Sequence, residues 1–359
     1  MTDAALYDLA PALRVALLGI VVASGPLAWV WLRNRQAAPA QRLTDSGLGC
    51  PDWPGCYGNA SPVGAVHEIR AEEARMPTGP VTHGKAWVEM VHRYLATGVG
   101  VLITTLALAT WLQRKRGVPV QPRWPAFTLA WVCLQGAFGA LTVTMKLFPA
   151  IVTLHLIGGL VLLALLATQA VAYRQAQRGT GPVALSSNVR NWLVAATVLL
   201  WLQVALGGWV STNYAVLACS EFPTCQGSWW PAMDFRQGFE LWRDLGKTGA
   251  GEHIAFAALT AIHYTHRLAA YALFVVLGVL AWRLRGGPLH AMSRVLAALA
   301  FWQFASGLSN VVLGWPLVAA VAHTGGAAGL VVALTWALRE SRSQPARDVP
   351  SLSPRKVSA

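Results

Sequence analysis

The sequence predicts an all-α polytopic membrane protein whose eight transmembrane helices form two homologous four-helix bundles. Three observations support this fold class. Of the 359 residues, 55% are hydrophobic and only 12% are charged, which is about half the charged fraction of a soluble domain. The apolar residues form long continuous runs, unlike the alternating pattern of a membrane β-barrel. Landmarks in the first half of the chain recur in the second half. Together these features exclude a water-soluble globular protein and a disordered chain.

Eight apolar stretches are each long enough to cross a bilayer as a helix. They occupy approximately residues 12–32, 86–112, 124–145, 149–173, 191–212, 254–282, 291–313 and 316–338. Because the number of stretches is even, we expect both ends of the chain on the same side of the membrane.

The chain repeats itself with a nearly constant offset. The matching landmarks, 168 to 174 residues apart, are Cys50 and Cys219, Gln135 and Gln303, His155 and His323, and His92 and His266. A four-helix unit returns to its starting side, so it can be repeated in parallel. We therefore expect an N-terminal half over 1–178, a C-terminal half over 179–340, and a disordered cytoplasmic tail over 341–359.

The net charge of +13 comes from 28 Lys and Arg against 15 Asp and Glu. In a membrane protein, cytoplasmic loops and contacts with anionic lipid account for such an excess, so we expect lipid and no nucleic acid as a partner. The short connections and the tail are rich in Arg, whereas two long loops, about 33–85 and 213–253, carry fewer basic residues for their length. This pattern places both termini in the cytoplasm and the long loops outside. The lack of an Arg- and Ser-rich presequence favours a bacterial inner membrane.

Four histidines lie inside apolar stretches, one in the second and one in the fourth helix of each half: His92, His155, His266 and His323. Their positions suggest a depth of about 10 Å below the outer surface, with His266 deeper. A single such histidine is as often a polar contact between helices, but two equivalent pairs favour ligands. A four-helix bundle can hold a haem iron between two imidazoles, whereas zinc needs three or four N or S ligands. The sequence therefore predicts a bis-histidine haem site in each half.

Glycine pairs follow two of these histidines, as Gly158-Gly159 and Gly325-Gly326. They could leave room for a flat macrocycle, or they could allow ordinary close packing of helices. Arg93 and Arg267 each directly follow a candidate ligand. A buried arginine needs an anionic partner, and a haem propionate or a structural ion pair could supply it.

The two halves differ at one chemically important position. Glu89 precedes His92 by three residues, so both lie on one face of a helix, and the residue in the same place before His266 is His263. A carboxylate beside a macrocycle can move protons, which predicts chemistry in the first half and a redox cofactor in the second. Alternatively, Glu89 only pairs with Arg93 or orients His92.

Each long loop contains a cysteine pair within the pattern C-x-[DE]-[WF]-P-x-C, namely Cys50 with Cys56 and Cys219 with Cys225. Local pairs on an extracytoplasmic face predict disulfides, with a structural role favoured over a redox role. Cys133 lies within an apolar stretch, and we expect it to be a small core residue.

Several motifs together carry a family resemblance: Arg42–Pro54 (RLTDSGLGCPDWP), Glu89–Ala96 (EMVHRYLA), Thr153–Leu156, Val210–Tyr214, the Cys219–Cys225 loop, His263–Arg267 and His323. Over residues 42–335, most of the chain, the sequence resembles the haem A synthase family. This combination of motifs is specific, although each motif alone is weak.

The resemblance implies an oxidoreductase that converts the C8 methyl group of haem O to the formyl group of haem A, for use in terminal oxidases. It implies that Glu89 is the catalytic carboxylate, that His92 and His155 ligate the substrate haem, and that His266 and His323 ligate haem b. Electrons would pass from the haem b half to the substrate half. Haem O synthase and cytochrome oxidase assembly factors are the implied protein partners.

The residues alone leave two other classes of protein open. One is a dihaem electron-transfer protein of the cytochrome b type, in which both haems are cofactors. The other is a haem transporter, which would move haem without changing it.

Overall fold

The computed structural model describes residues 48–77, 79–116 and 121–343. This part of the chain contains seven helices long and apolar enough to cross a membrane: α3 (His83–Leu112), α4 (Arg123–Thr144), α5 (Pro149–Arg178), α6 (Ser187–Thr212), α8 (Phe256–Leu284), α9 (His290–Val312) and α10 (Leu317–Glu340). The predicted polytopic all-α membrane fold is confirmed. The first predicted helix, 12–32, lies outside the described residues.

Local sequence explains where several of these helices begin and end. The Thr82 hydroxyl accepts a hydrogen bond from the backbone N–H of Lys85 at 3.2 Å and caps α3, and Ser186 caps α6 in the same way. Proline suits the first turn of a helix because no hydrogen bond is lost there, and α5 begins with Pro149. Gly179 follows α5 with φ of 61°, a left-handed conformation that ends helices and that glycine adopts without strain.

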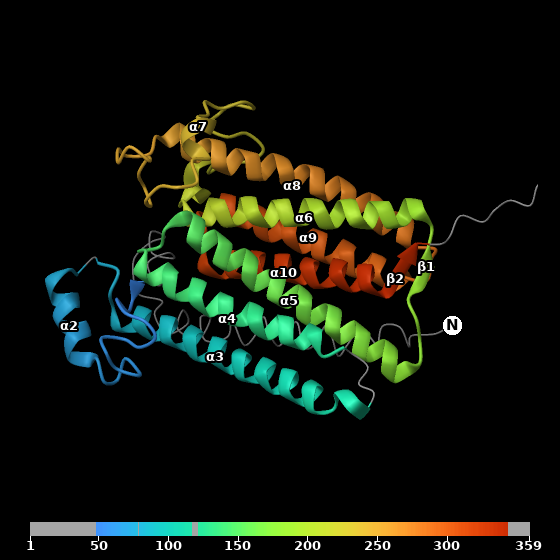
Figure 1. The fold of residues 1–359 in the computed structure, drawn as a ribbon. Coiled ribbons are helices and arrows are strands. Elements are labelled where there is room, and N and C mark those ends of the chain that lie inside the picture. The colour runs from blue at the N-terminus through green and yellow to red at the C-terminus, as the bar shows by residue number, and fades with distance from the viewer. Residues whose placement is uncertain (1–47, 78, 117–120, 344–359) are drawn as a thin grey trace, which may run out of the picture.

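The helices run side by side along one direction (Figure 1). α5 packs against α4 on one side and against α6 and α10 on the other, while α8 and α9 complete the second bundle. The two predicted halves therefore meet along α5, α6 and α10.

Both long loops lie at the same end of the bundle (Figure 1). The first loop contains α2 (Val66–Arg75), and the second contains η3 (Ala215–Ala218) and α7 (Phe235–Gly238). α2 is not among the elements predicted from the sequence, because its residues form no apolar run. The signal was instead its run of helix-forming residues and an i,i+3 ion pair between Glu72 and Arg75.

The opposite end of the bundle holds the short connections. η2 (Arg114–Arg116) follows α3, and β1 (Val183–Leu185) pairs in parallel with β2 (Ser341–Ser343). These strands are a small departure from the all-α prediction. They also place the first residues of the predicted disordered tail in a strand, and residues 344–359 lie outside the described part of the chain.

Polar contacts at this end join the predicted halves. Arg174 on α5 forms a half-buried ion pair with Glu340 on α10 at 3.3 Å. Arg190 on α6 donates hydrogen bonds to the backbone oxygen of Ser341 at 2.9 Å and to its hydroxyl at 3.1 Å. One such pair contributes little, but the set fixes α5, α6 and α10 against one another.

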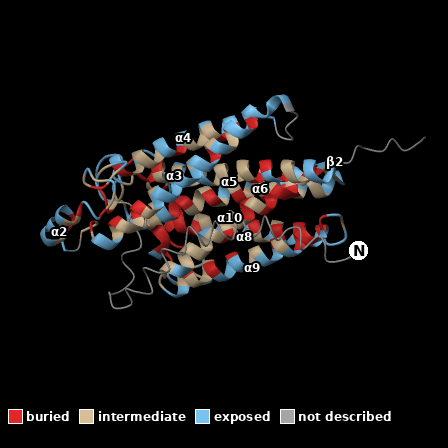
Figure 2. Ribbon diagram, turned by 90° about the horizontal axis from the view of Figure 1, so that it is seen from below, coloured by how far each residue is buried: buried red, intermediate tan, exposed pale blue. Residues whose placement is uncertain are grey.

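The largest described apolar core lies toward the same end. It is formed by leucines and other apolar residues from α5, α6, α8, α9 and α10, including Leu193, Leu277, Leu296 and Leu334. Figure 2 shows buried residues gathered between these helices, whereas α3 and α4 carry long exposed stretches. Cys133 on α4 is exposed, so its prediction as a core residue was wrong: this side of α4 faces away from the described helices. The packed end holds the fold together and leaves the loop end for the polar residues.

Candidate functional site

The first cysteine loop is a compact turn closed by a disulfide between Cys50 and Cys56. The Asp52 carboxylate accepts hydrogen bonds from the backbone N–H groups of Tyr57 at 2.6 Å and Gly58 at 2.7 Å. Gly58 has φ of 73°, a left-handed conformation that favours glycine. The acidic residue of the sequence pattern therefore fastens the turn that follows the second cysteine.

The second cysteine loop repeats this construction. Cys219 and Cys225 form a disulfide, and the Glu221 carboxylate accepts a hydrogen bond from the backbone N–H of Gly227. Gly227 is again left-handed, with φ of 72°. Both predicted disulfides are present, and the similarity of the loops agrees with the internal repeat.

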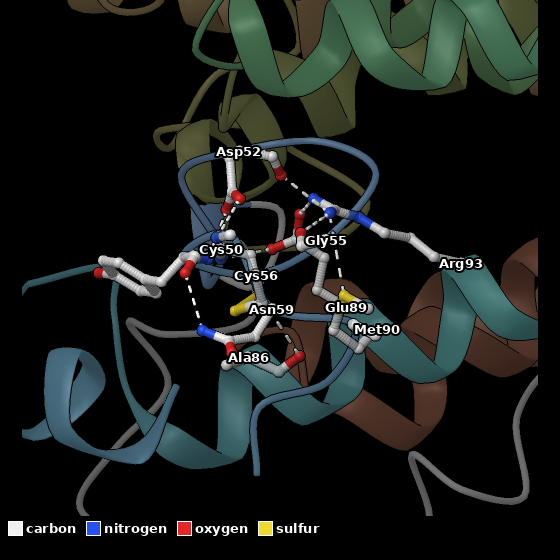
Figure 3. The surroundings of a disulfide bond; sticks show 12 residues. Cys50, Asp52, Gly55, Cys56, Asn59, Ala86, Glu89, Met90 and Arg93 are labelled. Atoms are coloured by element: carbon white, nitrogen blue, oxygen red, sulfur yellow. Dashed lines mark hydrogen bonds and ion pairs between the residues drawn. A yellow bond between two sulfur atoms is a disulfide. The ribbon is translucent and has the colours of Figure 1, made fainter. Parts of the chain in front are cut away.

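Arg93 on α3 fastens the first loop to the bundle (Figure 3). Its Nη1 donates hydrogen bonds to the backbone oxygens of Asp52 at 2.8 Å, Pro54 at 3.2 Å and Gly55 at 2.5 Å. These carbonyls lie between the two cysteines of the disulfide. The guanidinium group thus holds the whole turn against the helix.

Arg267 on α8 holds the second loop in the same way. Its guanidinium donates to the backbone oxygens of Glu221 at 3.1 Å, Pro223 at 3.3 Å and Thr224 at 2.9 Å. These partners could not be predicted from the sequence, because every residue has a backbone carbonyl and the residue types do not show which one is used. Contact of either arginine with a propionate stays a prediction.

Glu89 lies at the junction of α3 and the first loop and is only 8% exposed. Its Oε1 pairs with Nη2 of Arg93 at 2.5 Å, and its Oε2 accepts a hydrogen bond from the backbone N–H of Cys50 at 3.0 Å. Figure 3 shows the carboxylate between the loop and the arginine. A buried carboxylate is costly unless it is paired and hydrogen-bonded, and here both conditions are met.

Close approach of the loop to α3 depends on Gly49. A Cβ atom at this position would lie 2.7 Å from the backbone nitrogen of Ala86, which is closer than real Cβ contacts. Glycine therefore lets the N–H of the next residue, Cys50, reach Glu89.

The second half has no carboxylate at the corresponding position. His263 on α8 forms a hydrogen bond at 3.0 Å between its Nδ1 and the backbone oxygen of Ala215 in η3. The two junctions between helix and loop are therefore similar in structure, but the first contains a carboxylate, Glu89, where the second contains an imidazole, His263.

The structure brings the candidate ligands together in two pairs. His92 on α3 and His155 on α5 are close enough to interact electrostatically, and so are His266 on α8 and His323 on α10. Counted from the first residue of each helix, His92 and His266 lie about 14–15 Å along their helices and His155 and His323 about 9 Å. The apparent extra depth of His266 is thus shared by its counterpart His92.

His92 is the most exposed of the four; the other three are half-buried. In the second half, α6 covers His266, and the Gln203 amide nitrogen lies 3.0 Å from its Nδ1. The first-half counterpart of α6 is the predicted helix 12–32, which lies outside the described residues.

Glycines face three of the four imidazole rings. A Cβ atom added at Gly139, Gly207 or Gly307 would lie 3.4, 3.0 or 3.1 Å from Cε1 of His155, His266 or His323, respectively. Each glycine thus leaves room for a ring beside the neighbouring helix. Paired imidazoles on facing helices, with space kept for their rings, form a donor set that fits axial ligation of haem iron.

The glycines that follow the histidines have another use. A Cβ atom at Gly158 would lie 1.9 Å from the Gln135 amide nitrogen, and one at Gly326 would lie 2.6 Å from the ring of Trp302. Of the two explanations left open by the sequence, these residues support close helix packing, of α4 with α5 and of α9 with α10.

Arg243 is a structural residue that sequence reasoning counted only as loop charge. It is 3% exposed, and it donates hydrogen bonds to Oδ1 of Asn213 and to the backbone oxygen of Lys247. Burial lowers the pKa of this guanidinium. Its guanidinium also lies 5.7 Å from the ring centre of Trp209, so Arg243 fixes the second loop to the end of α6.

The comparisons with known proteins agree with one another. Residues 40–335 match the family model described as "Cytochrome oxidase assembly protein". The chain is 37% identical to "Heme A synthase" of Shewanella oneidensis over 297 residues, covering 82% of this chain and 88% of that protein. It is 29% identical to "Heme A synthase" of Caulobacter vibrioides, with 84% and 90% covered, and 26% identical to that of Halalkalibacterium halodurans, with 78% and 83% covered.

Replacing Arg93 by Leu should loosen the first cysteine loop and leave the second unchanged. Hydrogen bonds to a charged group contribute about 1.5–3 kcal/mol each, so amide hydrogen exchange at Tyr57, Gly58 and Asn59 should speed up at least about tenfold. Exchange is measured by mass spectrometry on the purified protein.

The matched control is Arg267→Leu, which should accelerate exchange around Gly227 and spare the first loop. If either variant loosens both loops equally, the two arginines do not act as separate local anchors.

Proposed function

The chain belongs to the haem A synthase family of cytochrome oxidase assembly proteins, and we propose that it oxidises the C8 methyl group of haem O to the formyl group of haem A. The observation that carries the proposal is the buried Glu89, one helical turn from His92 in the first half only. If one haem reacts and the other does not, the two sites must differ chemically. A carboxylate near only one of the two similar ligand pairs provides that difference.

The first half is the proposed substrate site. His92 and His155 would hold the iron of haem O, and Gly139 leaves space for the ring of His155. Two ligands on separate helices would restrict how the substrate haem lies relative to the junction of α3 and the first loop. Holding a reacting group in a fixed position contributes several kcal/mol to catalysis, on the order of 7–11 in well-oriented systems.

Glu89 is the proposed catalytic carboxylate. Conversion of a methyl group to a formyl group replaces two C–H bonds by a C=O bond, and an ionised carboxylate beside that carbon could accept a proton in the course of it. The Arg93 guanidinium and the Cys50 N–H both stabilise the negative charge of Glu89. They also fix the direction of its oxygens, so that a proton would be received at a defined place.

The second half is the proposed cofactor site. Haem b, when bound by His266 and His323, would supply one-electron transfer to the reaction. The residue equivalent to Glu89 here is His263, whose Nδ1 is engaged with the Ala215 carbonyl. This junction therefore offers no carboxylate base, in keeping with a haem that is not itself modified.

The proposed orientation puts the cysteine loops outside a bacterial inner membrane and both termini in the cytoplasm. Disulfides persist in oxidising compartments, and both lie at one end of the bundle. At the other end, arginines lie over tryptophan rings, as with Arg114 on Trp111 at 4.2 Å and Arg283 on Trp192 at 5.5 Å. Tryptophan is enriched at both membrane interfaces, but basic residues are enriched on the cytoplasmic side, so the arginines support this orientation. A haem O synthase and assembly factors of the oxidase are the proposed partners.

Extraction of haem from the purified protein tests the function directly. We expect haem A or hydroxylated haem O beside haem b when the extract is separated by reversed-phase chromatography. An extract with haem b alone would favour a dihaem electron-transfer protein, and haem flux without any change of haem type would favour a transporter.

Glu89→Gln should keep haem bound but abolish formation of the formyl group. The amide retains the size of the side chain and removes the proton acceptor. Haem content is read from the absorption spectrum and product from chromatography. Glu68→Gln, the same change at an exposed residue of α2, is the control. Unchanged haem A in Glu89→Gln would remove the catalytic role.

His266→Ala and His323→Ala should each deplete haem b, because each removes one axial ligand. The low-spin haem signal in the absorption and electron paramagnetic resonance spectra measures this loss. His290→Ala, an exposed position at the start of α9, should retain the signal. Full low-spin haem b in both ligand variants would contradict the proposed pairing.

A further inference from the structure

Ser306 on α9 touches the ring of His323 on α10. Its Oγ lies 3.0 Å from Nδ1 of His323. The same hydroxyl donates its proton to the backbone oxygen of Trp302 at 2.7 Å. It also lies 3.4 Å from the backbone oxygen of Gln303. A serine has one O–H to donate, and we assign it to the shorter contact with Trp302, so that towards His323 the oxygen acts as an acceptor.

This hydrogen-bond assignment gives the tautomer of His323. Because Ser306 accepts, Nδ1 must carry the proton, and Nε2 is left with its free lone pair. The ring of His323 also meets the backbone oxygen of Gln303, as the ring of His155 meets that of Gln135, and a carbonyl likewise can only accept. An imidazole that donates from Nδ1 and presents Nε2 is the form that binds a metal.

Gly307, the next residue along α9, supplies the space for this ring. A Cβ atom there would lie 3.1 Å from Cε1 of His323, so a side chain would push the ring by a few tenths of an ångström. Ser306 and Gly307 therefore act on the same imidazole ring. Ser306 accepts the proton on its Nδ1, and Gly307 leaves the space in which the ring lies.

The equivalent segment of the first half lacks the hydroxyl. Gln135-Gly-Ala-Phe-Gly139 aligns with Gln303-Phe-Ala-Ser-Gly307, so that Phe138 stands where Ser306 does. Gly139 faces the ring of His155 as Gly307 faces that of His323. Nδ1 of His155 is buried and has no side-chain hydrogen-bond partner among the described residues. The two halves thus share the room for the ring but not the hydroxyl.

We propose that Ser306 and Gly307 are positioning residues that present Nε2 of His323 to the haem iron of the second half, and that the Ser306 hydroxyl makes this site electronically different from that of the first half. The inference rests on the proposed function, since it takes His323 as a ligand of haem b. A hydrogen bond from Nδ1 increases electron donation by the imidazole, which stabilises the oxidised iron and lowers the midpoint potential.

The test is a redox titration of haem b in the purified full-length protein, followed by its absorption. Ser306→Ala should raise the midpoint potential and change the low-spin electron paramagnetic resonance signal. Ser306→Thr keeps a hydroxyl and should restore the wild-type values. Ser309→Ala makes the same chemical change one turn away, where the hydroxyl bonds only to the backbone of Ser306, and should have no effect.

Gly307→Ala provides a second measurement that does not depend on the hydroxyl. It should alter the low-spin signal or reduce the haem b content, whereas Gly278→Ala, at a position with open space on α8, should not. Loss of haem b from Ser306→Ala but not from Ser306→Thr would also support the proposal. A Ser306→Ala protein with wild-type potential and spectrum would overturn it, as would equal effects of Ser306→Ala and Ser309→Ala.

Haem chromatography on the same preparations separates this inference from the proposed function. If only haem b is extracted but Ser306→Ala still shifts its potential, the enzymatic function fails and the role of Ser306 stands. If haem A is present and Ser306→Ala changes nothing, the inference alone fails.

Discussion

In each half, the structure of the loop end depends on one set of hydrogen bonds, from an arginine side chain to the backbone carbonyls of the cysteine loop. Arg93 and Arg267 lie one residue after a candidate ligand, and each donates to three backbone oxygens between the cysteines of its loop. The disulfide keeps those oxygens in place, together with the acidic cap, which is the Asp52 or Glu221 carboxylate that accepts a backbone N–H of the turn. Because the arginine directly follows the histidine on the helix, the loop is fixed to the helical turn that carries one candidate ligand.

Much of this organisation could be predicted from the sequence, because polar residues inside apolar stretches stand out. The histidines, Glu89, the cysteine pairs and the long apolar helices were all visible in this way. The carbonyl partners of Arg93 could not be foreseen, since backbone atoms have no sequence signal. α2 was missed because hydrophobic runs, rather than helix propensity, guided the prediction. Cys133 was misplaced because an apolar stretch does not indicate which of its sides faces other helices, and the glycines near His155 were ambiguous until their neighbours were known.

The internal repeat gives the two halves similar scaffolds, which differ at a few chemically important positions. The acidic cap, the left-handed glycine, the anchoring arginine and the glycine facing the ring all occur in both halves. None of these elements distinguishes a substrate from a cofactor. We propose that the distinction depends on the residue three positions before the candidate ligand on α3 and α8, and on the residue beside the candidate ligand ring on α4 and α9.

These two differences act in a complementary way. In the first half a carboxylate is present at the loop junction, and Phe138 stands where the second half has a hydroxyl. In the second half His263 replaces the carboxylate, and Ser306 hydrogen-bonds the ligand. A proton acceptor beside the macrocycle serves chemistry at its edge, whereas a hydrogen bond to an axial ligand tunes the iron. In the function we propose, the first half would act on the periphery of a haem and the second on the electrons of its metal, with an equivalent pair of imidazoles in each half.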